Sequence, residues 1–232
     1  MIRRVTKVAL LLTVGALARP AFGQAEPQGR AVVKPEAAHF SEVVNGRIEV
    51  VTYRGRRAVK LLPPAAEGKN DEMLAILAGS QFKNGTIEVD VAGAPRAGMP
   101  PDARGFIGLA FRTGEHGEWA EIFYLRPTNG RADDQLRRNH SVQYVSNPDY
   151  PWYRLRQENP GVYESYVDLE TGVWTRMKIE VSGASARLYV NGASQPCLVV
   201  NDLKHGDGAG RVALWANIQT EAYFGTVSIV PK

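Results

Sequence analysis

Hydrophobic and polar residues alternate along most of the chain, in short runs that Gly, Asn, Asp and Pro residues separate. In residues 86–92 (TIEVDVA), Ile87, Val89 and Val91 point to one side of an extended strand and the polar residues to the other. No long stretch has the 3.6-residue period of an amphipathic helix. The expected strands are 47–53, 57–62, 73–77, 86–92, 105–112, 119–126, 141–146, 163–168, 174–181, 185–190, 197–203, 211–216 and 222–230. Short strands separated by turn signals predict an all-β fold, an antiparallel sandwich or barrel.

The strand expected at 105–112 (GFIGLAFR) has an unusual outer face. Ile107, Leu109 and Phe111 share the face that would pack in a core, while a glycine, an alanine and Arg112 share the other. Each sheet of a sandwich has one core face and one face toward solvent. Small residues on the solvent face leave room beside the sheet, so this strand is a candidate for the floor of a binding site.

The first 25 residues have the pattern of a secretory signal peptide. Residues 1–7 (MIRRVTK) are cationic, residues 8–18 (VALLLTVGALA) are apolar, and small residues near the end of this segment offer a cleavage site. The apolar run is too short for a membrane span, which needs about 20 residues. We therefore expect 1–25 to be removed on export to the periplasm or the cell exterior, 26–38 to form a flexible leader, and 39–232 to form one domain.

The net charge of the whole chain, +4, comes from this segment. Of the 28 basic residues, Arg3, Arg4, Lys7 and Arg19 lie in the expected signal peptide, and the first of the 24 acidic residues is Glu26. The mature chain is therefore expected to be neutral, which removes the main reason to expect a nucleic acid partner. With one cysteine, the chain can form no internal disulfide.

Several stretches along the chain share their pattern with a known superfamily. They are 82–91 (FKNGTIEVDV), 104–112 (RGFIGLAFR), 121–127 (EIFYLRP), 174–192 (WTRMKIEVSGASARLYVNG), 210–215 (GRVALW) and 222–229 (AYFGTVSI). The chain resembles the concanavalin A-like lectin/glucanase superfamily, in its laminin-G-like and secreted bacterial branches. In fold and compartment it is also similar to the 3-keto-disaccharide hydrolase domain. The resemblance implies a two-sheet antiparallel jelly-roll sandwich, a fold that hosts lectins, hydrolases, lyases and adhesion modules.

One strand departs from the catalytic pattern of that superfamily. Its retaining glucanases carry a Glu-x-Asp-x-Glu strand, whose outer carboxylates act as nucleophile and acid/base. Here Glu88 and Asp90 occupy the first two positions and Ala92 the third. That mechanism is therefore absent in its usual form, and we interpret Glu88 and Asp90 as solvated residues of an outer face.

An insert at residues 127–166 is rich in arginine and aromatic residues. Between Arg126 and Arg156 there are six arginines and three acidic residues, a local charge of +3. Tyrosines and a tryptophan gather at its C-terminal end. Aromatic rings stack on the apolar faces of sugars, and arginine donates paired hydrogen bonds to carboxylate or sulfate groups. We therefore predict a carbohydrate site on one sheet face and this insert.

Eight residues are the candidates for this site. The predicted substrate-binding residues are Arg112, Arg126, Gln143, Tyr144, Trp152 and Arg154. Glu121 and His140 are the predicted catalytic residues, because a carboxylate and an imidazole supply acid and base groups. The prediction requires these side chains to converge on one face.

The leading hypothesis is an exported, monomeric jelly-roll protein that binds a carbohydrate, with an acidic sugar as one class of ligand. One alternative is a carbohydrate-active enzyme, a glycoside hydrolase or a protein similar to a polysaccharide lyase, with Glu121 or His140 as base. A second is an envelope structural or protein-interaction module, which would expose a large apolar patch. We expect no cofactor, metal ligand set or membrane span. Calcium bound at Asp133–Asp134, or between Asp202 and Asp207, is the alternative on that point.

Overall fold

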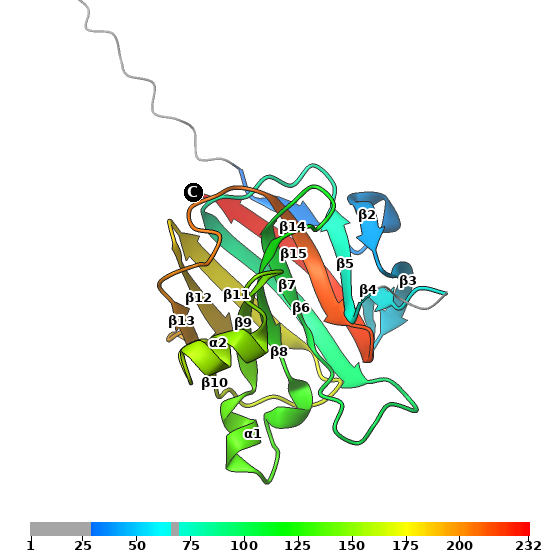
Figure 1. Ribbon diagram of the computed structural model, residues 1–232. Helices are drawn as coiled ribbons and strands as arrows, with labels where there is room; N and C mark the ends of the chain where they lie inside the picture. Colours follow the sequence, from blue (N-terminus) through cyan, green and yellow to red (C-terminus); the bar gives the residue numbers. More distant parts are fainter. Residues whose placement is uncertain (1–28, 66–69) are drawn as a thin grey trace, which may run out of the picture.

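Two antiparallel sheets pack face to face in the computed structural model, which describes residues 29–65 and 70–232 (Figure 1). The expected signal peptide, 1–25, lies outside the described residues. The larger sheet has the strand order β13-β12-β11-β6-β15-β4-β3, with β1 paired to β15. The smaller sheet has the order β10-β9-β8-β7-β14-β5-β2. The prediction of an all-β sandwich of two antiparallel sheets is therefore confirmed.

The elements have the following bounds. The strands of the larger sheet are β1 (Ala31–Val33), β3 (Arg47–Tyr53), β4 (Arg56–Leu62), β6 (Gly85–Pro95), β11 (Thr175–Ser182), β12 (Ser185–Val190), β13 (Leu198–Val200) and β15 (Thr220–Pro231). Those of the smaller sheet are β2 (Phe40–Val44), β5 (Glu72–Leu77), β7 (Ile107–Thr113), β8 (Ala120–Leu125), β9 (Val142–Asn147), β10 (Glu164–Ser165) and β14 (Arg211–Asn217). The helical elements are η1 (Ala37–His39), η2 (Pro127–Asn129), α1 (Gln135–Asn139) and α2 (Trp152–Glu158).

The expected strands match the observed ones in place, with differences at their ends. The two largest shortenings are 163–168, which is reduced to β10, and 197–203, which is reduced to β13, and the largest extension is 86–92, which becomes β6. The alternation did not predict β1 or β2. Because Ala31–Val33 pairs with Val227–Ile229 of β15, this part of the expected flexible leader is a strand of the sandwich. Three residues are too few to show an alternation.

A close contact between the sheets identifies the inward face of the smaller one. A Cβ atom on Gly93 of β6 would lie 2.7 Å from Cγ2 of Ile107 in β7. Ile107 therefore faces the larger sheet, and by alternation so do Leu109 and Phe111. The ring of Phe111 stacks with that of Phe123 in β8, with centroids 6.1 Å apart. The alternate residues of these strands point outward.

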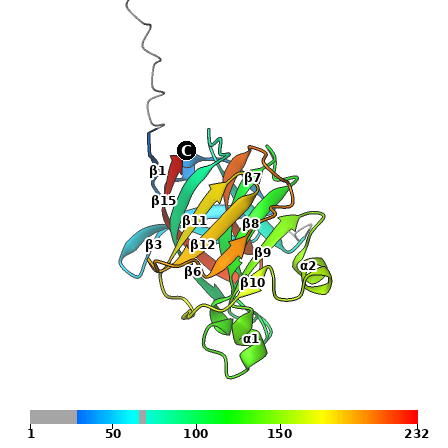
Figure 2. The same cartoon turned by 90° about the vertical axis from the view of Figure 1, so that its left-hand side faces the viewer.

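The segment between β8 and β10 carries η2, α1 and α2. The helix α1 lies at the lower end of the sandwich in both views, and α2 packs beside β9 (Figures 1 and 2). The backbone N–H of Thr128 in η2 donates to the carbonyl of Arg104, with 3.4 Å between N and O. The insert is therefore joined to the loop that connects β6 with β7. Within the described residues, no helix combines the length and apolar character that a bilayer span requires.

Candidate functional site

A cavity of about 560 Å³ opens at the end of the smaller sheet where the chain leaves β8. Its lining residues are Pro100, Asp102, Ala103, Arg104, Phe106, Tyr124, Arg126, Asn129, Arg137, His140, Trp152, Arg156 and Gln219. We call it the arginine cavity, because four of these side chains are arginines. Its volume lies in the range of small-ligand sites, about 300–1,000 Å³.

Aromatic rings form the floor of the arginine cavity. Gly108 lies between Tyr124 of β8 and Trp215 of β14 in the register of the smaller sheet. The rings of Tyr124 and Trp215 stack with centroids 4.8 Å apart, and Phe106 meets Tyr124 edge to face at 5.7 Å. A Cβ atom at position 108 would lie 2.1 Å from the carbonyl oxygen of Phe123. The space that the sequence predicts beside this glycine is therefore occupied by the β8 backbone at Phe123 and Tyr124.

Arg126 lies on this floor with its guanidinium held by several partners. Its Nη2 donates to the hydroxyl of Tyr124 at 3.1 Å and to Oε1 of Gln143 at 3.0 Å. The side-chain nitrogen of Gln143 donates in turn to the carbonyl of Tyr163 at 3.1 Å. Nη1 of Arg126 donates to the carbonyl of His140 at 3.0 Å. Arg126 and Gln143 are both buried, so they form a fixed pair at the base of the cavity.

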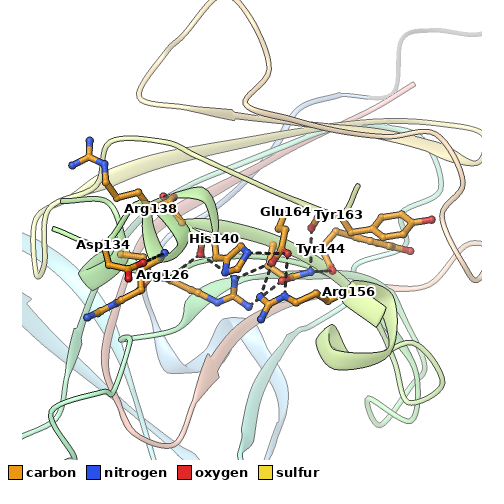
Figure 3. A network of polar contacts seen from close by, with 12 residues as sticks. Arg126, Asp134, Arg138, His140, Tyr144, Arg156, Tyr163 and Glu164 are labelled. Atoms are coloured by element: carbon orange, nitrogen blue, oxygen red, sulfur yellow. Dashed lines mark hydrogen bonds and ion pairs between the residues drawn. The ribbon is translucent and has the colours of Figure 1, made fainter. Parts of the chain in front are cut away.

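One carboxylate, that of Glu164 in β10, joins the side chains of His140 and Arg156 into a wall (Figure 3). Arg156 donates to both oxygens of Glu164, at 3.0 and 2.7 Å, and Nε2 of His140 lies 3.2 Å from Oε1. Burial lowers the pKa of His140. Glu164 opposes this shift, and the charges of Arg156 and Arg126 add to it. The imidazole is therefore mostly neutral at pH 7.

Arg104 and Arg137 differ from the other two arginines of the cavity. Neither has an ion-pair partner within 4.0 Å in the described part of the chain. Nε of Arg137 and Oδ1 of Asn129 are buried and make no hydrogen bond with any described residue. Burial and the like charge of Arg137 lower the pKa of Arg104. Asp102 also lines the cavity and partly opposes this shift, and Nη1 of Arg104 donates to the backbone carbonyl of Asp102. The cavity thus holds an unpaired donor, an unpaired acceptor and an excess of positive charge, and an anionic ligand with hydroxyl groups would satisfy all three.

A second cavity, of about 600 Å³, lies on the other side of the wall. Its lining residues are Leu136, Asn139, His140, Arg156, Pro160, Gly161, Glu164, Ser165 and Tyr166. We call it the tyrosine cavity. Because His140 and Arg156 line both cavities, the two are neighbours along one surface.

Of the eight predicted site residues, the structure brings four together. Arg126, His140 and Trp152 line the arginine cavity, and Gln143 holds Arg126 from behind. Trp152 is 45% exposed, so its ring is accessible to a ligand. The other four residues lie elsewhere, and the expectation that all eight converge is wrong.

Arg112 does not share the outward face of β7, contrary to its place in the alternation. The pairing of β7 with β14 shifts register at this point, and Arg112 has a φ of 50°. Its side chain is 1% exposed and donates to the carbonyls of Lys83, Gly183 and Gly206. Arg112 therefore joins three loops of the sandwich and has no surface for a ligand.

Glu121 and Tyr144 point inward, away from His140. Glu121 pairs with Phe111 in the register of β7 and β8, which places it on the inward face. Its oxygens accept hydrogen bonds from the hydroxyl of Tyr144 at 2.6 Å and from the backbone N–H of His205 at 2.8 Å. Both side chains are fully buried. The expectation that Glu121 shares a face with His140 is wrong, because the register reverses it.

Arg154 lines neither cavity. Its Nε donates to Glu158 at 2.8 Å, its Nη1 donates to the carbonyl of Asp149 at 2.7 Å, and its guanidinium lies 4.3 Å from the ring centroid of Tyr150. These contacts hold the side chain of Arg154 against α2 and the turn before it. The structure therefore does not place Arg154 at either cavity, contrary to the prediction.

The carboxylates that we kept as calcium alternatives have other partners. Asp134 accepts from the backbone N–H of Arg137 as the N-cap of α1, and Asp202 accepts from Nζ of Lys204 at 2.6 Å. Asp207 lies 3.1 Å from Nζ of Lys83. Among residues 29–65 and 70–232, no three His, Cys, Asp or Glu side chains are grouped to hold a metal ion.

The strand with the incomplete glucanase pattern, β6, belongs to the larger sheet and lies away from both cavities. Arg176 donates to both oxygens of Asp90, at 2.9 and 3.1 Å. Ala92 is buried. Asp90 is therefore one half of an ion pair on the outer face of that sheet.

Several residues of the two cavities were not predicted from the sequence. They are Arg104, Phe106, Tyr124, Asn129, Arg137, Glu164 and Tyr166. The high density of arginine and aromatic residues indicated the insert, which contains Arg137 and Tyr166, but did not single out either residue. Arg104 and Phe106 lie in a different loop, and nothing in their local sequence indicates that this loop meets the insert.

No family model matches the chain, and no curated protein matches its sequence. Its structure is similar to that of the carbohydrate-binding module CBM66 from Bacillus subtilis, with a TM-score of 0.54, 13% identity, and coverage of 79% of this chain and 91% of that one. A Bacillus subtilis protein of unknown function with a galectin-like fold matches with a TM-score of 0.55, 12% identity and coverage of 90% and 99%. Peanut lectin matches with a TM-score of 0.54, 9% identity, and coverage of 88% of this chain and 97% of that one. The protein therefore has the concanavalin A-like jelly-roll fold.

Proposed function

We propose that this protein binds an acidic carbohydrate, a saccharide with carboxylate or sulfate groups, in the arginine cavity. The observation that carries the proposal is the pair of guanidiniums without ion-pair partners, Arg104 and Arg137, beside the rings of Phe106, Tyr124 and Trp152. Arginine binds carboxylate and sulfate groups through paired, charge-assisted hydrogen bonds. Aromatic side chains supply the apolar surface on which a sugar ring lies.

The roles of the cavity residues follow from their present partners. Arg104 and Arg137 bind the anionic group, because they have no carboxylate partner among the described residues. Oδ1 of Asn129 accepts a hydroxyl of the sugar, since it is buried without a donor. Arg126 is already bonded to Tyr124 and Gln143, so it sets the shape and potential of the floor. Trp152 covers the sugar from α2.

Two further considerations support a carbohydrate ligand. Two of the structural neighbours are named as a carbohydrate-binding module and a lectin, although their 9–13% identity reports on the fold alone. Exposed large hydrophobic side chains are also concentrated in the insert, which holds five of the nine in the described residues: Leu136, Trp152, Tyr153, Val162 and Tyr166. Three of them, Leu136, Trp152 and Tyr166, line one of the two cavities. The proposal includes export through the signal peptide at 1–25, a monomeric state and a place in the laminin-G-like branch.

The test is a binding panel on the purified mature protein. Glucuronate, galacturonate and mannuronate oligosaccharides, sulfated oligosaccharides and neutral oligosaccharides are titrated by calorimetry. We expect binding to at least one acidic class and weaker binding to its neutral counterpart. No binding to any acidic saccharide would refute the proposal. Chromatography of the same mixtures after long incubation tests the enzyme alternative, since a hydrolase or lyase would shorten its substrate.

The affinity for an acidic saccharide should depend on pH through His140. In the free protein its pKa lies below the ordinary value of 6.5. A bound anion would raise that pKa. The complex would then bind protons more readily than the free protein, so the affinity rises as the pH falls toward the pKa of His140. Between pH 8 and 5.5 we expect affinity to increase by about 3- to 10-fold, because one pKa unit is worth a factor of ten. His140→Gln should flatten this profile, and an unchanged profile in that variant would assign the proton to another group.

A further inference from the structure

The arginine cavity and the tyrosine cavity share a wall and differ in character. Arginines and unpaired polar atoms line the first. Leu136, Pro160 and the ring of Tyr166 line much of the second. Figure 3 shows His140, Arg156 and Glu164 together in this wall, with Arg138 of α1 to one side. A ligand long enough to pass the wall would contact both cavities.

The ring of Tyr166 is fixed in a position suited to stacking. It is 40% exposed, and its hydroxyl accepts from Nη2 of Arg138 at 2.8 Å. The guanidinium of Arg138 also lies 4.9 Å from the ring centroid. An exposed ring that is already held loses little conformational entropy when a flat apolar surface packs on it.

Polar groups without partners surround this ring. Oδ1 of Asn139 accepts from Gln135 at 2.7 Å, but Nδ2 of Asn139 and the hydroxyl of Ser165 make no hydrogen bond with any described residue. Both residues line the tyrosine cavity. A held aromatic ring with hydrogen-bonding groups at its edge fits a sugar unit, which has an apolar face and hydroxyls around it.

From this arrangement we propose that the ligand is a chain of at least two sugar units that crosses the His140–Arg156 wall. Its acidic unit occupies the arginine cavity, and the adjoining unit packs on Tyr166 in the tyrosine cavity. The inference rests on the proposed function and adds to it the length of the ligand and the second contact surface. It also places Glu164 beside the bond between the two units, since Glu164 lines the tyrosine cavity and holds both residues of the wall.

The experiment compares uronate mono-, di- and trisaccharides on the mature protein by calorimetry. For the wild type we expect affinity to rise by about 10-fold or more from mono- to disaccharide, as burial of an aromatic ring predicts. Tyr166→Ala should abolish this rise and leave affinity for the monosaccharide unchanged, which also shows that the variant is folded. Tyr166→Phe, which keeps the ring, should retain most of the rise. Tyr189→Ala, on β12 of the larger sheet, is the matched control and should bind as the wild type does.

The outcomes separate this inference from the proposed function. If affinity for the disaccharide equals that for the monosaccharide, or if Tyr166→Ala keeps the full rise, the two-cavity inference is wrong while binding in the arginine cavity stands. If the wild type binds none of the uronates, the proposed function fails for this sugar class and the inference fails with it. A rise with length that disappears in Tyr166→Ala supports both.

Discussion

Replacing Arg137 with methionine is expected to weaken the binding of a uronate oligosaccharide by about 10- to 100-fold. A charge-assisted hydrogen bond contributes about 1.5–3 kcal/mol, and each 1.4 kcal/mol is a factor of ten in affinity. Methionine keeps the length of the apolar stem and removes the fork. The backbone of Arg137 is held by the N-cap Asp134, which the substitution leaves in place. Arg104→Met should have an effect of similar size.

The same variants should keep or gain stability. Burial lowers the pKa of Arg104, the like charge of Arg137 adds to this shift and Asp102 partly opposes it, so the two guanidiniums repel each other in the free protein. Removing one relieves that repulsion, and the cost is a loss of binding, as in many sites where function opposes stability. Arg131→Met is the matched control. Arg131 lies in the same insert, but it is paired with Asp168 and Glu170 and lines neither cavity. Wild-type affinity in both Arg137→Met and Arg104→Met would contradict the proposed site.

Replacing Arg112 with methionine is expected to lower the free energy of unfolding by about 3–5 kcal/mol, because it removes a buried charged group whose partners stay behind. Arg112 donates to carbonyls from three separate loops, at Lys83, Gly183 and Gly206. In a chain of this length the melting temperature should fall by roughly 10 °C. Urea unfolding and calorimetric melting measure the change, with Arg131→Met again as control.

Binding by Arg112→Met below its melting temperature tests whether Arg112 lies away from the ligand. The sequence placed Arg112 at the ligand, whereas the structure turns it toward three loops of the sandwich. Uronate affinity in the folded variant should therefore equal that of the wild type. A stable variant with lost affinity would reverse the assignment.

The alternation of hydrophobic and polar residues predicted the strands well, since a strand with one buried face must repeat every two residues. The alternation failed at Arg112, where a shift in register and a positive φ turn the side chain away from its expected face. The alternation also did not predict the face of the sheet on which Glu121 lies. The register between β7 and β8, which puts Glu121 opposite Phe111, follows from how the strands pair and not from the local pattern.

The chemical composition of the insert predicted part of the site. Arg126, His140, Gln143 and Trp152 do gather at one place, as the density of arginine and aromatic residues indicated. Arg104 lies in the loop before β7, and its meeting with η2 depends on the packed fold.

The expected local charge of +3 was a poor guide to which arginines are available. Glu158, Glu164, Asp168 and Glu170 lie beyond the window in which the charge was counted or at its edge. They pair with Arg154, Arg156 and Arg131. With Arg126, which lies 3.8 Å from Glu164, four of the six arginines counted from Arg126 to Arg156 are thus paired with acidic residues that follow the counted segment in sequence. The unpaired positive charge of the cavity comes from Arg137 together with Arg104.

The most direct test of the account is a pair of calorimetric titrations of the mature wild-type protein. One uses a uronate trisaccharide and the other the same trisaccharide after reduction of its carboxylates to alcohols. The ligands have the same rings and differ in charge, so the comparison isolates the anionic group that Arg104 and Arg137 are proposed to bind. We expect the acidic form to bind at least 10-fold more tightly, with a preference that falls as salt concentration rises. Equal affinity for the two forms would contradict the central claim.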